Sequence, residues 1–351
     1  MQTRIRLALL LMTFALGLDS CRHKAPEVEV VEYNDTVVVT EHTNLYLVDV
    51  GGKYGYIVDS GSMAIKPQFE LATDFVDGLA CVRMGGKWGY INKHGQMVIA
   101  PQYDKADRFS EGLACVAMDS CFGFINKAGD TVIQPQFTNA HRFSEGLASV
   151  MIGEGRNAEW GFIDTTGTFV VKPRFDEAKY FTGGIACVRL GNKFGYIDKT
   201  GEYVINPRFD YAEDFCEDLA LIMMNNCYGY IDRKGYVVID WQFEHATPFT
   251  NGIAKVFVGM FGNGKHGFID MTGNYLISPR FDDAKPFSEG RAAVLDSETN
   301  KWGYLDMTGQ YAISPQFDSA SPFSNGLAVV WKNGQRHYIN KTGTIVWTFP
   351  N

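Results

Sequence analysis

The side chains that could carry out catalysis are spread along the chain and do not gather into a motif. The 7 histidines stand in separate segments, and two of them, His94 and His141, fall in loop or connector positions. A nucleophile elbow places a serine between a strand and a helix, and a zinc site needs cysteines or histidines at short spacing. The sequence contains neither pattern, and it has no phosphate loop or dinucleotide fingerprint. We therefore expect no catalytic residues, no metal site and no cofactor.

The serines and carboxylates that could act as nucleophiles or acids recur at fixed positions. Ser110, Ser144 and Ser288 each belong to a Phe-Ser-Glu-Gly segment, in which a glutamate such as Glu111 precedes the glycine. Turn chemistry is sufficient to explain these serines. A glycosidase needs one particular pair of carboxylates about 5–10 Å apart, whereas carboxylates repeated in successive units are more often structural. An envelope hydrolase is therefore only a remote alternative.

Cysteine usage leaves two interpretations open. Three of the cysteines share one repeat position, where other units carry Ser149, Leu221, Lys255, Ala293 or Val329. An even number of cysteines in an exported protein suggests disulfides, and a pairing of neighbouring units would join Cys81 to Cys115. We favour the interpretation that these are small side chains on strands. The cysteines after Cys21 are Cys81, Cys115, Cys121, Cys187, Cys216 and Cys227.

The first 20 residues have the pattern of a secretory signal peptide. Arg4 and Arg6 precede an apolar run over residues 7–18, as in such signals, and the run is shorter than the roughly 20 residues of a membrane span. It ends in Leu-Asp-Ser-Cys at residues 18–21, which resembles the lipobox of bacterial lipoproteins, although Asp19 is unusual there. We expect Cys21 to carry a lipid and to become the N-terminus of an exported, membrane-anchored protein.

Glycines mark a repeat that fills the rest of the chain. One glycine follows an aromatic residue at successive spacings of 34, 34, 38, 34, 34, 38 and 36 residues, and a second set of turn glycines keeps the same spacings. The first set is Gly55, Gly89, Gly123, Gly161, Gly195, Gly229, Gly267 and Gly303. A fixed period of this size indicates structural units that stack on their neighbours. We divide the chain into a signal peptide (1–20), a tether after the lipidated cysteine (21–43) and one repeat array (44–351).

Each unit predicts a three-stranded antiparallel meander. In one copy the strands are 79–83, 88–92 and 97–100, with Gly85-Gly86 as a two-residue hairpin and the last strand ending at Pro101. The connector at 102–111 is expected to form a single capped turn. The glycine after the aromatic is expected to let the next unit approach closely. No window has a sustained 3.6-residue apolar period, so the fold class is all-β.

About nine whole units fit between residue 44 and the end of the chain. Nine three-stranded units could wind as an open superhelical array or close as a propeller-like ring. Counting from the first strand leaves no half unit with which the two termini could complete one sheet together. The spacing also varies between 34 and 38 residues. Both observations favour the open array.

The most regular copy of the repeat reads Lys-Trp-Gly-Tyr-Ile-Asn-Lys at 87–93, followed by Pro-Gln-Tyr-Asp and Phe-Ser-Glu-Gly-Leu-Ala. This pattern resembles the bacterial WG-repeat (KWG-type) family, and the resemblance covers about residues 46–347. Trp88, Trp160 and Trp302 keep the tryptophan, and other units replace it with tyrosine, phenylalanine or histidine. The resemblance implies a β-repeat module that acts as an interaction scaffold in secreted, lipoprotein and signalling-associated proteins. It implies no catalytic residues.

Composition and resemblance together predict a binding protein at the bacterial cell envelope. A net charge of -8 argues against nucleic acid as a partner, because phosphates require a basic surface. We expect a protein partner, and contact with a membrane only through the lipid on Cys21. The alternative is a glycan-binding module that stacks sugars on exposed aromatics. The repeat is broken at Asp218, Trp241, His266 and Arg291, so a specialised surface would be sought first in the later units.

Overall fold

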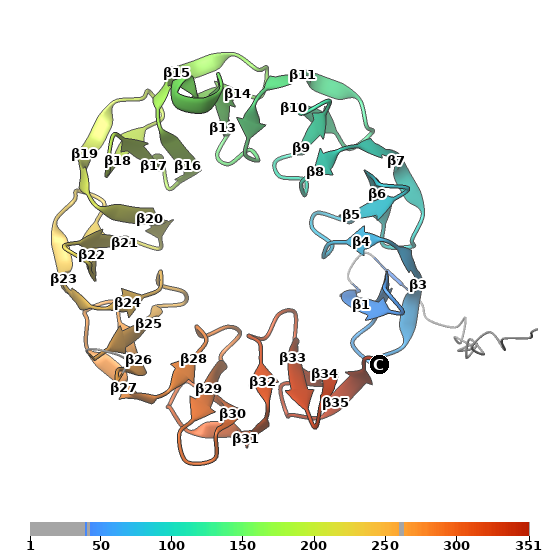
Figure 1. The fold of residues 1–351 in the computed structure, drawn as a ribbon, viewed down its shortest axis with the longest axis vertical. Helices are drawn as coiled ribbons and strands as arrows, with labels where there is room; N and C mark the ends of the chain where they lie inside the picture. Colours follow the sequence, from blue (N-terminus) through green and yellow to red (C-terminus); the bar gives the residue numbers. More distant parts are fainter. Residues whose placement is uncertain (1–38, 41–42, 260–262, 351) are drawn as a thin grey trace, which may run out of the picture. The chain divides into compact units, whose positions relative to one another are not determined.

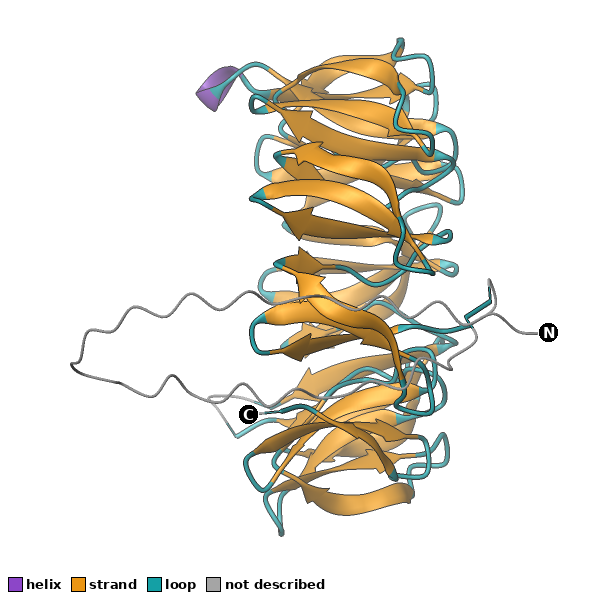
Figure 2. Ribbon diagram, turned by 90° about the vertical axis from the view of Figure 1, so that its right-hand side faces the viewer, coloured by secondary structure: helices purple, strands orange, loops and turns teal. Residues whose placement is uncertain are grey.

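The computed structural model describes residues 39–40, 43–259 and 263–350, which belong to one compact unit. In this unit nine antiparallel sheets stand side by side as the blades of a propeller-like ring (Figure 1). Seen edge-on, the strands run between the two faces of the ring and the loops gather on those faces (Figure 2). The predicted all-β fold of about nine repeats is confirmed. The predicted signal peptide, Cys21 and nearly all of the predicted tether lie outside the described residues.

The blades follow one another in chain order, each beginning with its innermost strand. Blade 1 has three strands: β1 (Tyr46–Val50), β2 (Lys53–Ile57) and β3 (Met63–Phe69). Blades 2 to 5 consist of β4 (Leu71–Ala72), β5 (Leu79–Met84), β6 (Lys87–Asn92) and β7 (Met97–Tyr103); β8 (Lys105–Ala106), β9 (Leu113–Met118), β10 (Cys121–Asn126) and β11 (Thr131–Phe137); β12 (Asn139–Ala140), β13 (Leu147–Ile152), the 3-10 helix η1 (Gly155–Asn157), β14 (Glu159–Asp164) and β15 (Phe169–Phe175); and β16 (Glu177–Thr182), β17 (Ile185–Leu190), β18 (Lys193–Asp198) and β19 (Tyr203–Phe209).

The remaining four blades continue the same order. They consist of β20 (Tyr211–Cys216), β21 (Leu219–Met224), β22 (Cys227–Asp232) and β23 (Val237–Phe243); β24 (His245–Ala246), β25 (Ile253–Val258), β26 (Lys265–Asp270) and β27 (Tyr275–Phe281); β28 (Asp283–Ala284), β29 (Ala292–Asp296), β30 (Lys301–Leu305) and β31 (Tyr311–Phe317); and β32 (Ser319–Ala320), β33 (Leu327–Lys332), β34 (Gln335–Asn340) and β35 (Ile345–Thr348). Figure 1 places β7, β11, β15 and their equivalents on the outer rim, and the first strand of each blade faces the centre.

The blades contain one more strand than the sequence predicted. Blades 2 to 9 have four strands in the order in which the chain forms them. The extra strand comes from the connector, for example β8 at Lys105–Ala106, which was expected to form a capped turn. The outermost strand was also predicted too short: β7 continues through Pro101 to Tyr103. A proline is tolerated there because the outer edge of this strand has no partner that needs its N–H. The predicted hairpin is confirmed, since Gly85 and Gly86 have φ of 58° and 79°.

The glycine of the repeat signature makes room for the outermost strand of its own blade. A Cβ atom on Gly89 would lie 2.5 Å from the Ile99 carbonyl oxygen and 2.7 Å from the Pro101 nitrogen. The register between β6 and β7 shifts at this point, because Trp88 pairs with Tyr103 while Tyr90 pairs with Ile99. The additional residues of β7 therefore bulge across the glycine. The expectation that this glycine serves the approach of the next unit was wrong.

The hydrophobic core lies in layers between the blades. Between blades 2 and 3, the ring of Tyr90 on β6 packs 4.9 Å from that of Phe109, which follows β8. The Tyr90 hydroxyl donates a hydrogen bond to the Asp107 carbonyl oxygen at 2.8 Å, so the polar end of this buried ring is also satisfied across the interface. A large buried side chain contributes roughly 1.5–3 kcal/mol. Because a single blade cannot enclose its own faces, the blades depend on their neighbours.

The ring closes by contact between blades 9 and 1. Tyr338 on β34 donates a hydrogen bond to the Leu47 carbonyl oxygen on β1 at 2.8 Å, and Arg336 lies 3.8 Å from Asp49. A buried cluster joins Tyr46 and Val48 to Leu327. The prediction that favoured an open array was therefore wrong. Among the described strands, no blade combines strands from the two ends of the chain, as the unit count predicted, and closure is achieved by packing between whole blades.

Tyr46 of blade 1 packs at the contact between blades 9 and 1, which we call the seam. In the other eight blades the equivalent residue is an alanine, such as Ala80, and a phenylalanine from the connector packs on the aromatic residue of the preceding blade, as Phe75 packs on Tyr56 at 4.8 Å. One period before Phe75 the sequence has Glu41, so blade 1 lacks the connector phenylalanine. The ring of Tyr46 lies 6.0 Å from that of Tyr338, and its hydroxyl donates to the Asn325 carbonyl oxygen. Phe349, which follows β35, also packs on Tyr338 with 5.3 Å between ring centroids, and Tyr46 adds a second aromatic ring in place of the connector phenylalanine.

The six cysteines of the described residues are free. Cys81, Cys115 and Cys187 are buried on strands, which confirms that they act as small core side chains. Burial raises the pKa of the Cys81 and Cys115 thiols to about 12. The alternative pairing of Cys81 with Cys115 is not formed, because both thiols are free.

Candidate functional site

The inner wall of the ring carries residues whose charge and size differ from blade to blade. Each connector has the pattern Ala-x-x-Phe, in which the alanine and phenylalanine pack into the blades. The two residues between them follow the first strand of the blade directly, or belong to it in β16 and β20, and this strand faces the centre of the ring (Figure 1). We call these pairs the inner wall. They are Thr73-Asp74, Asp107-Arg108, His141-Arg142, Lys179-Tyr180, Glu213-Asp214, Thr247-Pro248, Lys285-Pro286 and Ser321-Pro322.

Blades 4 to 6 hold a connected polar and aromatic group on this wall. The Arg142 guanidinium lies over the Tyr180 ring at 4.1 Å from its centroid and donates to the Tyr180 hydroxyl at 3.0 Å. The Lys179 ammonium donates to the Glu213 carboxylate at 2.6 Å and to the Ala212 carbonyl oxygen at 3.0 Å. Each contact crosses from one blade to the next. The innermost strands β16 and β20 have six residues here, against two in the other four-stranded blades.

Asp214 is the least satisfied member of this group. Its carboxylate accepts the N–H of Tyr180, but its buried Oδ1 has no hydrogen-bond partner among the described residues. Desolvation raises the pKa of Asp214 to about 6, against the opposing effect of the Lys179 ammonium. A carboxylate oxygen without a donor is costly in a low-dielectric setting. A ligand that brings a donor or a positive charge to this wall would lower that cost.

His141 links the inner wall to a signature tryptophan. Its imidazole stacks on Trp160 at 4.7 Å with an angle of 18° and lies 5.3 Å from the Tyr180 ring. Nδ1 is 2.9 Å from the Ser149 hydroxyl. Burial lowers the pKa of His141, and a hydrogen bond from the imidazole to the backbone of Ala178 opposes this shift. His141 is therefore a packed member of the group, although its sequence position predicted a variable connector residue.

The inner wall is asymmetric around the ring. In blades 3 to 6 its positions hold charged, aromatic or imidazole side chains, whereas blades 7, 8 and 9 have Pro248, Pro286 and Pro322 as the second residue. The charged part of the wall, which we define as Asp107-Arg108 through Glu213-Asp214, therefore occupies the earlier units. The hypothesis that a specialised surface would lie in the later units did not identify it.

The four breaks of the repeat in later units do not form one cluster. Trp241 is in β23 on the outer rim, and Asp218 is in a turn, 3.5 Å from Arg233. His266 packs against Phe257 at 4.8 Å, and desolvation lowers its pKa to about 4. Arg291 has a buried Nε without a hydrogen-bond partner among the described residues. These residues lie on separate elements of blades 6, 7 and 8.

The signature residues predicted from the repeat lie in the framework of the blades. Trp160 and Trp302 are buried, with 7% and 8% of their surface exposed, and Trp88 is half-buried against Tyr103 on the neighbouring strand. These tryptophans offer little surface on which a sugar could stack. In the part of the chain that the structure describes, the exposed aromatic residues are instead Tyr236, Tyr275, Tyr311 and Trp331, three of which lie on or beside the outer-rim strands β23, β27 and β31.

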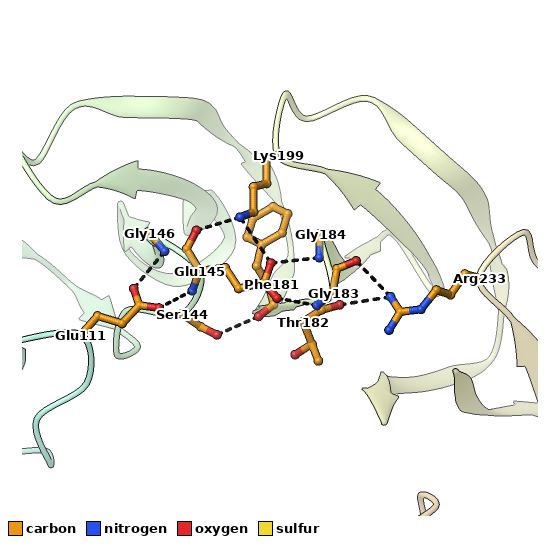
Figure 3. A network of polar contacts seen from close by, with 10 residues as sticks. All are labelled: Glu111, Ser144, Glu145, Gly146, Phe181, Thr182, Gly183, Gly184, Lys199 and Arg233. Carbon is orange, nitrogen blue, oxygen red and sulfur yellow. Dashed lines mark hydrogen bonds and ion pairs between the residues drawn. The ribbon is translucent and has the colours of Figure 1, made fainter. Parts of the chain in front are cut away.

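The repeated serines and glutamates join neighbouring blades. Glu111 accepts the backbone N–H groups of Glu145 and Gly146 at 2.6 and 2.9 Å. Glu145 in turn accepts those of Gly183 and Gly184, and it pairs with Lys199 (Figure 3). The same network contains Ser144, whose hydroxyl donates to the Phe181 carbonyl oxygen at 2.7 Å, and Arg233, which donates to the Gly183 carbonyl oxygen at 3.0 Å. One blade thus caps the turn of the next.

Comparison with known proteins identifies the repeat. The family model described as WG containing repeat matches eight stretches, at residues 54–88, 88–120, 122–155, 160–194, 194–226, 228–259, 267–296 and 302–335. The chain belongs to the WG containing repeat family. No curated protein matches it.

Among solved structures, the chain is similar to "Crystal structure of the eukaryotic initiation factor", with 11% identity, a TM-score of 0.61, and coverage of 88% of this chain and 98% of that one. It is also similar to Hsv2p of Kluyveromyces lactis, with 10% identity, a TM-score of 0.43, and coverage of 69% and 94%. At these identities the first likeness shows the fold alone, and the second carries no argument.

Two further properties of the described residues limit the chemistry. Residues 39–40, 43–259 and 263–350 contain no group of three or more His, Cys, Asp or Glu side chains placed to hold a metal ion. Within the same part of the chain, no helix has the length and apolar character to cross a membrane. The sequence did contain a signal for the inner wall, because the two positions inside Ala-x-x-Phe vary in charge while both flanking residues stay fixed.

Proposed function

We propose that this WG-repeat protein is a non-catalytic scaffold of the bacterial cell envelope that binds a partner protein on the charged part of its inner wall. The observation that carries the proposal is the connected group of Arg142, Tyr180, Lys179 and Asp214, which crosses three blades. The repeated glycines, serines and glutamates stabilise the ring itself. The inner-wall pairs vary freely, and they combine an aromatic ring with an arginine, residue types that often anchor protein interfaces.

The location is proposed from the sequence. The charged start, the apolar run at 7–18 and the Leu-Asp-Ser-Cys ending favour export and lipid attachment at Cys21. A lipid on that cysteine would tether the ring to a membrane without a spanning helix. Incorporation of a labelled fatty acid into the wild-type chain, and its loss in Cys21→Ser, is the expected result. Equal labelling of both chains would contradict the lipid anchor.

The binding role is tested by a pull-down from envelope extract with residues 22–351, run beside a polysaccharide array. We expect one stoichiometric protein partner. The double substitution Arg142→Gln with Asp214→Asn should abolish its capture, because it removes both charges and leaves polar side chains in their place. Glu154→Gln with Arg156→Gln is the matched control: it also removes one charge of each sign, from an exposed hairpin. Equal loss of capture in the control would contradict binding on the inner wall.

A glycan-binding module is the alternative, and the exposed rim aromatics are the observation that favours it. Tyr236 is 69% exposed and Tyr275 is 47% exposed, so their ring faces are available for stacking on sugars. Retention of one polysaccharide that is lost in Tyr236→Ala with Tyr275→Ala, in the absence of a protein partner, would support this alternative. It would also exclude the scaffold function proposed above.

A further inference from the structure

One position of the repeat contains a lysine where other blades bury small or apolar groups. Cys81, Cys187, Leu221 and Ala293 occupy it with 1%, 1%, 3% and 0% of their surface exposed. In blade 7 the residue is Lys255, which is half-buried on β25. At the same place between blades 2 and 3, Cys81 lines a pocket of about 210 Å³ together with the inner-wall residues of both blades. The position therefore opens onto the inner wall.

The side chain of Lys255 points toward blade 8. Alternate residues of a strand share one face, so Lys255 lies on the same face of β25 as Ile253. Ile253 packs into a cluster with Ala284 and Phe287, which belong to the connector of blade 8. The lysine is thus directed into the layer between blades 7 and 8, at its inner edge.

A second lysine lies at this edge. Lys285 follows β28 on the inner wall, and its ammonium is 5.0 Å from the centre of the Trp302 ring and 3.4 Å from the Asp283 carboxylate. The other oxygen of Asp283 accepts the N–H of Ala284 at 2.7 Å and lies 3.9 Å from His266 Nε2. The nearby carboxylate is therefore shared among several donors.

The ammonium of Lys255 is left without a hydrogen-bond partner in the described part of the chain. Desolvation lowers its pKa, Lys285 lowers it further, and Asp283 opposes both effects. Lys179, another half-buried lysine of this structure, does have such partners: its ammonium donates to the Glu213 carboxylate at 2.6 Å and to the Ala212 carbonyl oxygen at 3.0 Å. Lys255 lacks such partners, and its ammonium is not among the buried polar atoms of the described residues that have no partner, so it is open to solvent and a bound anion would supply the missing acceptor.

We propose that Lys255 and Lys285 form an anion site on the inner wall between blades 7 and 8, which binds a compact oxyanion such as a phosphate or a carboxylate. Thr247 borders Lys255: its hydroxyl oxygen accepts the Lys255 backbone N–H at 3.1 Å, which leaves the hydroxyl proton available to the anion. Pro248 and Pro286 flank the site and hold the local backbone at fixed φ. The site lies outside the charged part of the wall and does not depend on a protein partner.

The test uses the purified full chain with inorganic phosphate, acetate and chloride as probes at equal ionic strength. The lysines are labelled by reductive ¹³C-methylation, and the Lys255 signal is assigned by its absence in Lys255→Leu. This substitution introduces the residue that blade 6 carries at the same position, Leu221. Lys234→Leu, an exposed turn lysine, is the matched control. Thermal unfolding is followed in the same solutions.

We expect phosphate or acetate, but not chloride, to shift the Lys255 signal and to raise its pKa and the Tm of the protein. A response to phosphate alone identifies a phosphoryl site, and a response to acetate alone identifies a carboxylate site. Affinity should fall at least tenfold in Lys255→Leu and remain unchanged in Lys234→Leu. An equal response to chloride, or no shift of the Lys255 signal with any anion, would overturn the site. An unchanged rise of Tm in a folded Lys255→Leu would do the same.

Discussion

Tyr46 is the residue whose replacement tests how the ring closes. The other eight blades have alanine at this position, so Tyr46→Ala restores the common residue of the repeat. We nevertheless expect it to be strongly destabilising. In the other blades the alanine leaves space for a phenylalanine from the connector, and at the seam this phenylalanine is missing from the sequence.

The size of the effect follows from the burial of the ring. Tyr46 is 6% exposed, and an aromatic side chain buries about 150–250 Å². At about 25 cal/mol per Å² this is worth roughly 4–6 kcal/mol as an upper bound, and truncation of buried aromatics typically costs about 3–5 kcal/mol. Loss of the hydrogen bond to Asn325 adds about 1 kcal/mol. We expect a loss of about 4 kcal/mol for Tyr46→Ala and about 1 kcal/mol for Tyr46→Phe.

Urea unfolding measures the change in the free energy of unfolding, and small-angle scattering reports whether the ring opens. Tyr236→Ala is the control, because Tyr236 is 69% exposed on the rim and should change stability by less than about 0.5 kcal/mol. The radius of gyration should increase in Tyr46→Ala alone. A loss below about 1 kcal/mol, with an unchanged radius of gyration, would refute the assignment of Tyr46 as the residue that closes the seam.

Three further outcomes are expected. Gly123→Ala should lower the free energy of unfolding, measured with urea, by about 2–4 kcal/mol, because its Cβ would lie 2.5 Å from the Ile133 carbonyl oxygen. Gly112→Ala adds the same methyl group in open space at φ 81° and should lower it by only about 1–2 kcal/mol. Equal losses in the two variants would contradict the bulge of the outermost strand across the signature glycine. The pKa of Asp214 is raised to about 6, so its contribution to stability falls as pH rises from about 4 to 7. At pH 7.5 the free energy of unfolding of Asp214→Asn, measured with urea, should therefore exceed that of the wild type by on the order of 2–3 kcal/mol. At pH 4 the two proteins should be equally stable. A difference that does not change with pH would contradict the raised pKa. A thiol reagent should modify half-buried Cys121 before buried Cys81, whose pKa is about 12; equal rates in the folded protein would contradict this order.

Much of each blade could be predicted from short-range patterns. The hairpin at Gly85-Gly86 follows from the need for positive φ at two successive residues, and the spacing of the signature glycines set the number of units. The sequence also placed the repeated glutamates in turns, where Glu111 and Glu145 now cap the turns of the following blades. These features depend on contacts within one unit or with the next, and several copies repeat them.

The innermost strand and the bulge of the outermost strand could not be predicted from the sequence, because each forms only against a neighbouring strand. The connector around Lys105 resembles a loop when taken alone, but it becomes β8 since β9 offers it an edge. Gly89 looked like a point of contact with the next unit, whereas the bulge of β7 through Pro101 occupies the space above it. Neither outcome is set by local propensity, because both depend on which strand edge lies alongside.

The sequence by itself determined the all-β repeat, its period, its turns and the number of blades, since these arise from local backbone geometry and recurring apolar positions. Only the tertiary structure decided that the ring closes and which residues face its centre. Closure depends on the small rotation between successive blades summed over all nine, and on contacts such as that of Tyr338 with Leu47, which are 291 residues apart. The inner wall exists for the same reason: Arg142, Tyr180 and Asp214 meet only because the ring brings the innermost strands of three blades together.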